Sequence, residues 1–296
     1  MKFFLLAFMC LLIIGGAFYG GIYTEKKHGN TVQAIALKEK GATNAVAKAK
    51  ELEEKIEIAK AKGEVAKAIL AEEKLQVKSE EYKKDLTGRS KRVVVIDPGH
   101  SSIVDLATEP EAPGSKIMKI KEPGGGHGDF TKTPEYVVNM VVAVKLRSLL
   151  QEKGYTVIMT KTKSTQVLGS IARAEVGNKA KADLVIRIHA DSSDETSVQG
   201  STMLIPTDTK YTDSIYKTSK EYGQIVFNNL IKVVGMNSRG VVEKSDMTGF
   251  NWSKVPVMLI EMGFQSNFTE DHLLTTDSYQ DKLAKGLADG IDQALK

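Results

Sequence analysis

Cysteine is almost absent from this sequence, because its 296 residues contain only Cys10, which lies inside an uncharged apolar run. A single cysteine excludes a disulfide framework within the chain, and it also excludes a metal site of the CxxC type. The lone thiol does not decide the redox compartment. Histidines and carboxylates are left as the side chains that can carry metal binding or acid–base chemistry.

Net charge is missing from the larger part of the chain. The first 90 residues hold 16 basic and 12 acidic side chains, whereas residues 91–296 hold 25 of each. A domain that binds nucleic acid concentrates basic side chains on one face or along one stripe. Residues 91–296 have neither a basic surplus nor a basic stripe, so we expect no nucleic acid among the partners of this protein.

Charged side chains are missing from residues 3–22, a run about as long as a bilayer-spanning helix. One interpretation is an uncleaved signal anchor that ties the chain to a membrane. The other is a signal peptide that is cut after the small residues 15–17. Under both interpretations residues 1–24 are a targeting segment, and the rest of the chain lies outside the cytoplasm.

Proline is missing from residues 31–86, a stretch that is rich in alanine, lysine and glutamate. Between Ala42 and Val77, small and apolar residues recur at alternating steps of three and four, with Glu73 breaking the series. The pattern predicts a helical spacer over residues 25–90 with a thin heptad-like seam. The spacer is a single solvated helix, a coiled coil through which the chain self-associates, or a partly disordered segment. In each case it buries too little to hold an active site.

From residue 91 onward the chain alternates strand-like and helix-like segments, which is typical of an α/β domain. Residues 91–296 are also numerous enough to bury a core of their own. Three strand-like runs are followed within a few residues by an ionisable side chain. These are residues 93–96 with His100, residues 184–188 with His189, and residues 255–260 with Glu261.

The positions of these three side chains predict a shared site. In open α/β sheets, ligands bind in the crevice beyond the carboxyl ends of the strands. If the three strands lie side by side, His100, His189 and Glu261 meet at that edge. One polar strand ending carries little information, whereas two histidines and a carboxylate together can bind a metal and transfer protons.

A fourth candidate, Glu135, lies at a predicted helix start. Thr133 suits the N-cap, Pro134 suits the first helical position, and apolar residues follow at helical spacing. Glu135 either complements the helix dipole or joins the shared site. Two histidines and one carboxylate are the ligand set of a catalytic zinc ion with a fourth position open for water, and a second carboxylate can act as general base and acid. Residue types alone leave open which glutamate binds the metal.

Four motifs in residues 93–296 resemble those of a known family. They are VIDPGH, TPEYVVN, IRIHAD and VMLIEMGFQSN, in this order along the chain. Residues 93–296 thereby resemble the zinc-dependent N-acetylmuramoyl-L-alanine amidases of the amidase type 3 family, which are cell-wall hydrolases. The resemblance implies that His100, Glu135 and His189 are zinc ligands and that Glu261 is catalytic. The first 92 residues lie outside it.

The resemblance also implies a fold, a cofactor and a substrate. The expected fold is α/β, with a mostly parallel sheet of about six strands between helices, preceded in this chain by the apolar N-terminal helix and the long helical spacer. The expected cofactor is one Zn²⁺ per catalytic domain, which spans residues 91–296. The expected substrate is peptidoglycan, in which a zinc-activated water hydrolyses the amide between N-acetylmuramic acid and L-alanine while Glu261 transfers the protons.

Further residues are candidates for supporting roles. The histidine rings need acceptors for their second N–H group, and we expect Asp97 or Asp191 to supply them. Arg239, Trp252 and Asn139 are candidate substrate-binding residues. For Trp252 the alternatives are stacking against a glycan, packing in the core, or anchoring the rim of the site.

The link between His100 and Glu135 is longer than in many members of the family. Its 34 residues include glycines at positions 124–126 and 128, which predict a mobile loop that shapes access to the site. His127 in this loop is expected to be exposed to solvent. Arg173, in a helix-like segment further along the chain, is expected to form a structural salt bridge.

Two other functions remain open at this point. One is a different zinc-dependent peptidase or amidase that acts on the stem peptides of the cell wall. The other is a non-catalytic wall-binding regulator, although the presence of all four metal-binding and proton-transferring residues argues against it. In each case the expected location is extracytoplasmic, either anchored to the membrane by the N-terminal helix or secreted to the cell wall.

Overall fold

The computed structural model of the protein describes residues 92–296. The predicted targeting segment at residues 1–24 and the predicted spacer at residues 25–90 lie outside the described residues. Within residues 92–296, no helix combines the length and the apolar composition that crossing a membrane requires.

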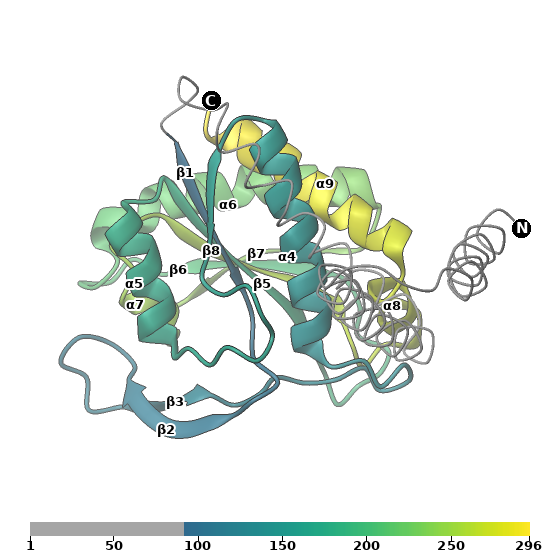
Figure 1. The fold of residues 1–296 in the computed structure, drawn as a ribbon, viewed down its shortest axis with the longest axis horizontal. Helices are drawn as coiled ribbons and strands as arrows, with labels where there is room; N and C mark the ends of the chain where they lie inside the picture. The colour runs from purple at the N-terminus through teal and green to yellow at the C-terminus, as the bar shows by residue number, and fades with distance from the viewer. Residues whose placement is uncertain (1–91) are drawn as a thin grey trace, which may run out of the picture. The chain divides into compact units, whose positions relative to one another are not determined.

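A six-stranded sheet in the order β4-β1-β5-β8-β6-β7 forms the centre of this part (Figure 1). Its strands are β1 (Val93–Pro98), β4 (Thr156–Met159), β5 (Leu184–Asp191), β6 (Ser201–Pro206), β7 (Ser238–Lys244) and β8 (Val257–Phe264). All neighbouring strands pair in parallel except β6 and β8, which are antiparallel. The predicted fold, a mostly parallel sheet of about six strands, is confirmed.

Helices cover both faces of the sheet, with α4 and α9 on one side and α5 and α7 on the other (Figure 1). The helices are α4 (Glu135–Glu152), α5 (Ser170–Ala180), α6 (Asp213–Val234), α7 (Thr248–Asn251), α8 (Phe268–Leu274) and α9 (Asp277–Ala294). In β1, Val94 and Ile96 belong to the core under α4 and α9, whereas Val95 belongs to the core on the opposite face. Alternate residues of one strand thus serve two cores, which explains the continuous β-branched run in the sequence.

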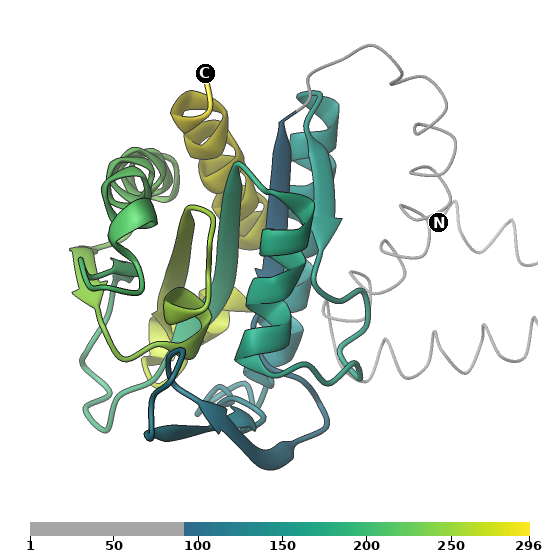
Figure 2. The ribbon, with the colours of Figure 1, turned by 90° about the vertical axis from the view of Figure 1, so that its left-hand side faces the viewer.

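The link between His100 and Glu135 contains a second, two-stranded sheet. Its strands β2 (Asp105–Pro110) and β3 (Met118–Glu122) pair in antiparallel fashion. Figures 1 and 2 both show this hairpin beyond the end of the main sheet toward which β1 runs. The expectation of a loop over this whole segment is wrong. Residues Met118 to Lys121 alternate between apolar and charged side chains and between more exposed and more buried positions, as a strand does, and the flanking glycines and prolines obscured that signal.

Candidate metal centre

Three neighbouring strands carry three of the predicted site residues to one edge of the sheet. β1, β5 and β8 are adjacent and parallel, and His189 of β5 pairs in register with Glu261 of β8. His100 follows the end of β1, where the Gly99 N–H donates to the Ile188 carbonyl. The strands β1, β5 and β8 therefore lie side by side, as the predicted shared site requires.

The fourth residue, Glu135, is the first residue of α4 and lies between the two histidines. Its Oε2 is 3.2 Å from His100 Nε2, and its Oε1 is 3.1 Å from His189 Nδ1. The two imidazole rings meet edge to face, with 4.8 Å between their centroids. One ligand atom from each of the three residues lies within 4.8 Å of the others. The structure thus brings the three predicted ligands together.

The spacing and charge of these donors fit a zinc ion. Donors placed about 2.0–2.1 Å from a tetrahedral zinc lie about 3.3 Å apart, close to the distances between Glu135 and the histidines. Burial raises the pKa of Glu135, but the hydrogen bond from His189 and the charges of both histidines outweigh it and lower the pKa to about 2. Burial lowers the pKa of His189 to about 4. Near neutral pH the carboxylate is ionised and the imidazole is neutral, the states in which both bind metals.

Two glycines make room for the histidine rings. A Cβ added to Gly99 would lie 2.3 Å from Cε1 of His189, and one added to Gly125 would lie 2.6 Å from Cγ of His100. His100 itself has a φ of 58°, a left-handed conformation that is uncommon for a residue with a side chain. The Gly126 N–H also donates to Glu135 Oε2 over 3.1 Å. The glycine-rich segment therefore packs against the cluster as part of its wall.

Asn139, a candidate substrate-binding residue, instead contacts the predicted ligand Glu135. Its side chain is fully buried, and its Nδ2 donates to Glu135 Oε1 over 3.0 Å. The same carboxylate oxygen accepts a hydrogen bond from the backbone N–H of Ala190. Asn139, one turn along α4 from Glu135, therefore orients the ligand carboxylate, and burial leaves its side chain no route to a substrate.

Glu261 faces the same pocket as the two histidines. This pocket, of about 320 Å³, is lined by His100, His189 and Glu261 together with residues of β3 and α7. Oε2 of Glu261 is buried and has no hydrogen-bond partner among the described residues. Burial raises the pKa of Glu261 well above its ordinary value, and the negative charges of Glu135 and Asp191 raise it further. A carboxylate with a raised pKa next to a metal cluster is suited to accept and return a proton.

The predicted acceptors for the histidine rings are wrong. Asp97 is buried and bonds instead to Arg173, Arg187 and Thr160, at 2.8, 2.9 and 2.6 Å. Burial raises the pKa of Asp97, but the two guanidinium groups outweigh it and hold the pKa far below its usual range. Asp191 accepts from the backbone N–H of the next residue and from neither histidine. Asp97, at the end of β1, therefore pairs with two arginines and does not accept a hydrogen bond from a histidine ring.

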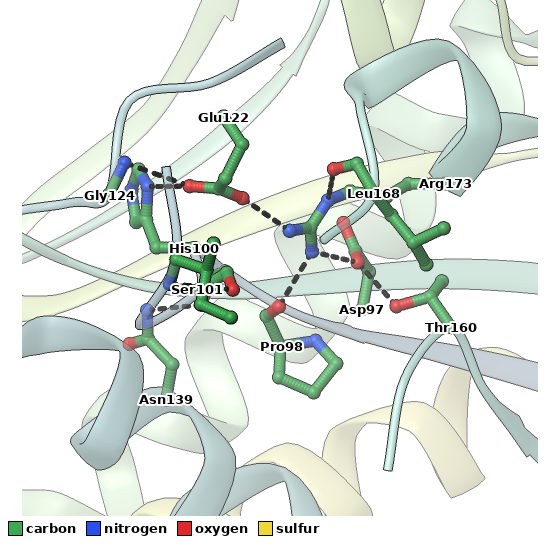
Figure 3. A network of polar contacts seen from close by, with 12 residues as sticks. Asp97, Pro98, His100, Ser101, Glu122, Gly124, Asn139, Thr160, Leu168 and Arg173 are labelled. Carbon is green, nitrogen blue, oxygen red and sulfur yellow. Dashed lines mark hydrogen bonds and ion pairs between the residues drawn. The ribbon is translucent and has the colours of Figure 1, made fainter. Parts of the chain in front are cut away.

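The acceptor for His100 is Glu122, the last residue of β3 (Figure 3). Its Oε1 lies 3.3 Å from His100 Nδ1, and its Oε2 accepts from Arg173 over 2.7 Å. The salt bridges of Arg173 confirm the structural role expected for it. Glu122 is not among the predicted site residues, because nothing local links an acid before a Pro-Gly run to a histidine 22 residues earlier.

The other predicted substrate contacts lie outside the residues that line the pocket. Trp252 Nε1 donates to the carbonyl of Pro110 over 3.0 Å, so the indole anchors the hairpin, as in the rim-anchor alternative. Arg239 on β7 lies over the ring of Phe264, 5.1 Å from its centroid. His127 is exposed, as expected, and its backbone pairs with that of Pro134.

A mostly parallel α/β sheet with a His–Glu–His cluster and a second glutamate at its carboxyl edge has the layout of a metal-dependent hydrolase. Residues 94–293 match the model of the Amidase_3 family, described as N-acetylmuramoyl-L-alanine amidase. This chain belongs to that family.

Curated relatives are similar over part of their length. N-acetylmuramoyl-L-alanine amidase LytC of Bacillus subtilis is 27% identical over an alignment of 173 residues, covering 56% of this chain and 33% of LytC. AmiC of Neisseria meningitidis is 24% identical over 248 residues, covering 70% of this chain and 54% of AmiC. The chain thus spans about a third to a half of these relatives.

Solved structures share the fold. The amidase Ami1 of Mycobacterium abscessus aligns with a TM-score of 0.64 at 22% identity, covering 70% of this chain and all of Ami1. The N-acetylmuramoyl-L-alanine amidase of Clostridium difficile 630 aligns with a TM-score of 0.57 at 25% identity, covering 69% of this chain and 96% of that one. Both alignments leave close to a third of this chain unmatched.

Proposed function

We propose that this protein is a zinc-dependent N-acetylmuramoyl-L-alanine amidase that hydrolyses the amide between N-acetylmuramic acid and L-alanine in peptidoglycan. The observation that carries the proposal is the convergence of His100, Glu135 and His189 in one cluster, whose two histidines line a pocket together with Glu261, in a chain of this family. The proposed catalytic domain is residues 91–296.

Three side chains would hold the metal: His100 through Nε2, Glu135 through its carboxylate, and His189 through a ring nitrogen. When bound, zinc supplies a Lewis acid that makes water nucleophilic near neutral pH and polarises a carbonyl oxygen. His100 and His189 contribute no charge in their neutral forms, so Glu135 is the one anionic ligand. The metal would keep positive charge for the developing oxyanion.

Glu261 is the proposed proton carrier. It takes a proton from the attacking water as the new C–O bond forms at the amide carbon. It then delivers that proton to the amide nitrogen as the C–N bond breaks. The products are the lactyl carboxylate on the sugar and a free L-alanine amine on the peptide. The raised pKa of Glu261 supports this role, because the group must hold the proton between the two steps.

The rest of the chain would place this activity outside the cytoplasm. We propose that residues 1–24 act as a signal anchor or signal peptide and that residues 25–90 form a helical spacer, with self-association through its seam as one option. The support for this placement is the uncharged run at residues 3–22 and the fact that peptidoglycan lies outside the membrane.

The test uses the full chain and intact peptidoglycan. Metal analysis should find one zinc ion per chain. Mass spectrometry of the digest should find stem peptides with a free L-alanine amine and glycan that retains whole muramic acid. Cleavage within the stem peptide would favour the peptidase alternative, and binding without any cleavage would favour a wall-binding regulator.

A further inference from the structure

The β2–β3 hairpin is attached to the α/β body by buried polar contacts. Glu109 on β2 is 6% exposed, and its Oε1 accepts from the Ile171 N–H in the first turn of α5. Glu122 on β3 is 2% exposed and pairs with Arg173 of α5. Trp252 bonds to the hairpin backbone from the end of α7. Three separate contacts therefore fix the hairpin in place.

Glu122 uses its two carboxylate oxygens for different purposes (Figure 3). Oε1 faces His100 Nδ1 at 3.3 Å and also accepts the Gly124 N–H at 3.0 Å. Oε2 accepts from the guanidinium of Arg173, at 2.7 Å. Burial raises the pKa of Glu122, but the hydrogen bonds from His100 and Gly124 outweigh it, so the pKa is lowered. One oxygen is thus held by a cation while the other is presented to the ring.

Arg173 is itself immobilised. Its side chain is 4% exposed, its Nε donates to the Leu168 carbonyl, and its Nη1 donates to both Asp97 and the Pro98 carbonyl. All three guanidinium nitrogens are therefore engaged, and two of these contacts reach the end of β1 just before His100. The guanidinium ties the hairpin carboxylate to the same strand that carries the metal ligand.

We propose that Glu122 is a positioning residue for His100, so that the inserted hairpin sets how tightly the site holds its metal. This inference rests on the proposed metal site. Each ring nitrogen of His100 faces a carboxylate oxygen, with Nδ1 3.3 Å from Glu122 and Nε2 3.2 Å from Glu135. With Nε2 bound to a metal, the ring hydrogen would lie on Nδ1 and donate to Glu122, which fixes the tautomer and the orientation of the ring. Without Glu122, the ring loses its fixed tautomer and orientation. Removal of such outer partners typically costs about 10–100-fold in metal affinity or activity.

The test compares Glu122→Ala and Glu122→Gln in the full chain with a control, Glu111→Gln. Glu111 follows β2 in the same hairpin turn and pairs with Lys119 at 3.0 Å, and it is not among the residues that line the pocket with His100. Zinc affinity is measured by competition with a chromogenic chelator. The alanine variant should lose affinity about 10–100-fold. The glutamine variant should fall between it and wild type, because an amide oxygen still accepts from Nδ1 without the negative charge. The control should stay within twofold.

Two further measurements, circular dichroism and the release of stem peptides, separate the outcomes. Circular dichroism of the metal-free proteins reports folding, and a purely structural role would lower the melting temperature while leaving zinc affinity unchanged. If the alanine variant does not fold, the glutamine variant decides. Unchanged zinc affinity in the folded variants, with wild type still releasing stem peptides, would overturn the inference and leave the proposed function standing. A wild type that binds zinc but releases no peptide would overturn the proposed amidase function. The comparison of zinc affinities would still test the role of Glu122 in positioning His100.

Discussion

Gly99 offers the most direct test of the site geometry, because a single methyl group would press on a metal ligand. In Gly99→Ala, the new Cβ would lie 2.3 Å from Cε1 and 2.6 Å from both nitrogens of the His189 ring. Gly99 does not have a positive φ, so the substitution introduces no left-handed strain of its own. The effect of the change therefore comes from the contact with the ring.

The size of the effect follows from the overlap. Nonbonded carbon atoms prefer a separation of about 3.5–4.0 Å, so the His189 ring must move by about 1.2 Å. Catalytic groups have to be held within about 0.5 Å of their productive positions, and a displacement of 1 Å costs about 100-fold in rate. We therefore expect kcat/KM to fall about 100-fold, or about 2.7 kcal/mol in transition-state stabilisation.

The assay measures the release of stem peptides from peptidoglycan, together with the zinc content of the purified protein. The matched control is Gly126→Ala. There the new Cβ would lie 3.5 Å from Ser192 Oγ, which is ordinary contact, and the N–H that donates to Glu135 is retained. The control should keep activity within about threefold. A Gly99→Ala protein with full zinc and near-normal activity would show that His189 does not occupy the position described.

Three further substitutions test separate parts of the mechanism and the fold. Glu261→Gln should keep zinc and abolish peptide release, and activity within tenfold of wild type would remove Glu261 from the mechanism. His189→Ala should lose both zinc and activity, and metal retained at full stoichiometry would show that the ligand set is wrong. Asp97→Asn removes the buried carboxylate that pairs with both Arg173 and Arg187, so urea unfolding should show a loss of about 3–5 kcal/mol. Because the folded state lowers the pKa of Asp97, its stabilisation in wild type is complete above the ordinary value of 3.8 and is lost as the pH falls below it. The difference in free energy of unfolding between wild type and variant should therefore be smaller at pH 3 than at pH 7, and an equal difference at both would contradict this sign.

The sequence was sufficient for the residues whose positions follow from the main sheet. His100, His189 and Glu261 each follow an apolar strand, and parallel neighbours bring such endings to one edge. Glu135 was harder to assign, because a glutamate in the first helical turn has an ordinary role in complementing the dipole. Only the contacts to both histidines distinguish the two roles.

The contacts of Asp97 and Glu122 were not predictable from the sequence, because they depend on the register of the sheet and on how the hairpin packs. Asp97 was expected beside a histidine from its position in the motif, yet its pairing with two arginines needs the register between β1 and β5, where Asp97 lies opposite Arg187. Glu122 required both the hairpin and its docking on α5. Neither arrangement is encoded in a local pattern of residues, because each contact joins segments that lie at least 22 positions apart.

The pairing of Asp97 with Arg187 also matters for Glu261. The charge of Arg187 lowers the pKa of Glu261 and so opposes the burial that raises it. Arg187 Nε is held at 2.9 Å by Asp97, and Gly249 lies so close that an added Cβ would be 2.3 Å from Arg187 Nη1. The guanidinium is therefore paired with Asp97 and confined in the wall of the pocket that His189 and Glu261 also line. Burial and the charges of Glu135 and Asp191 outweigh the charge of Arg187, so the pKa of Glu261 stays raised. The same buried acid thus supports both ends of the site, through Arg173 toward His100 and through Arg187 toward Glu261.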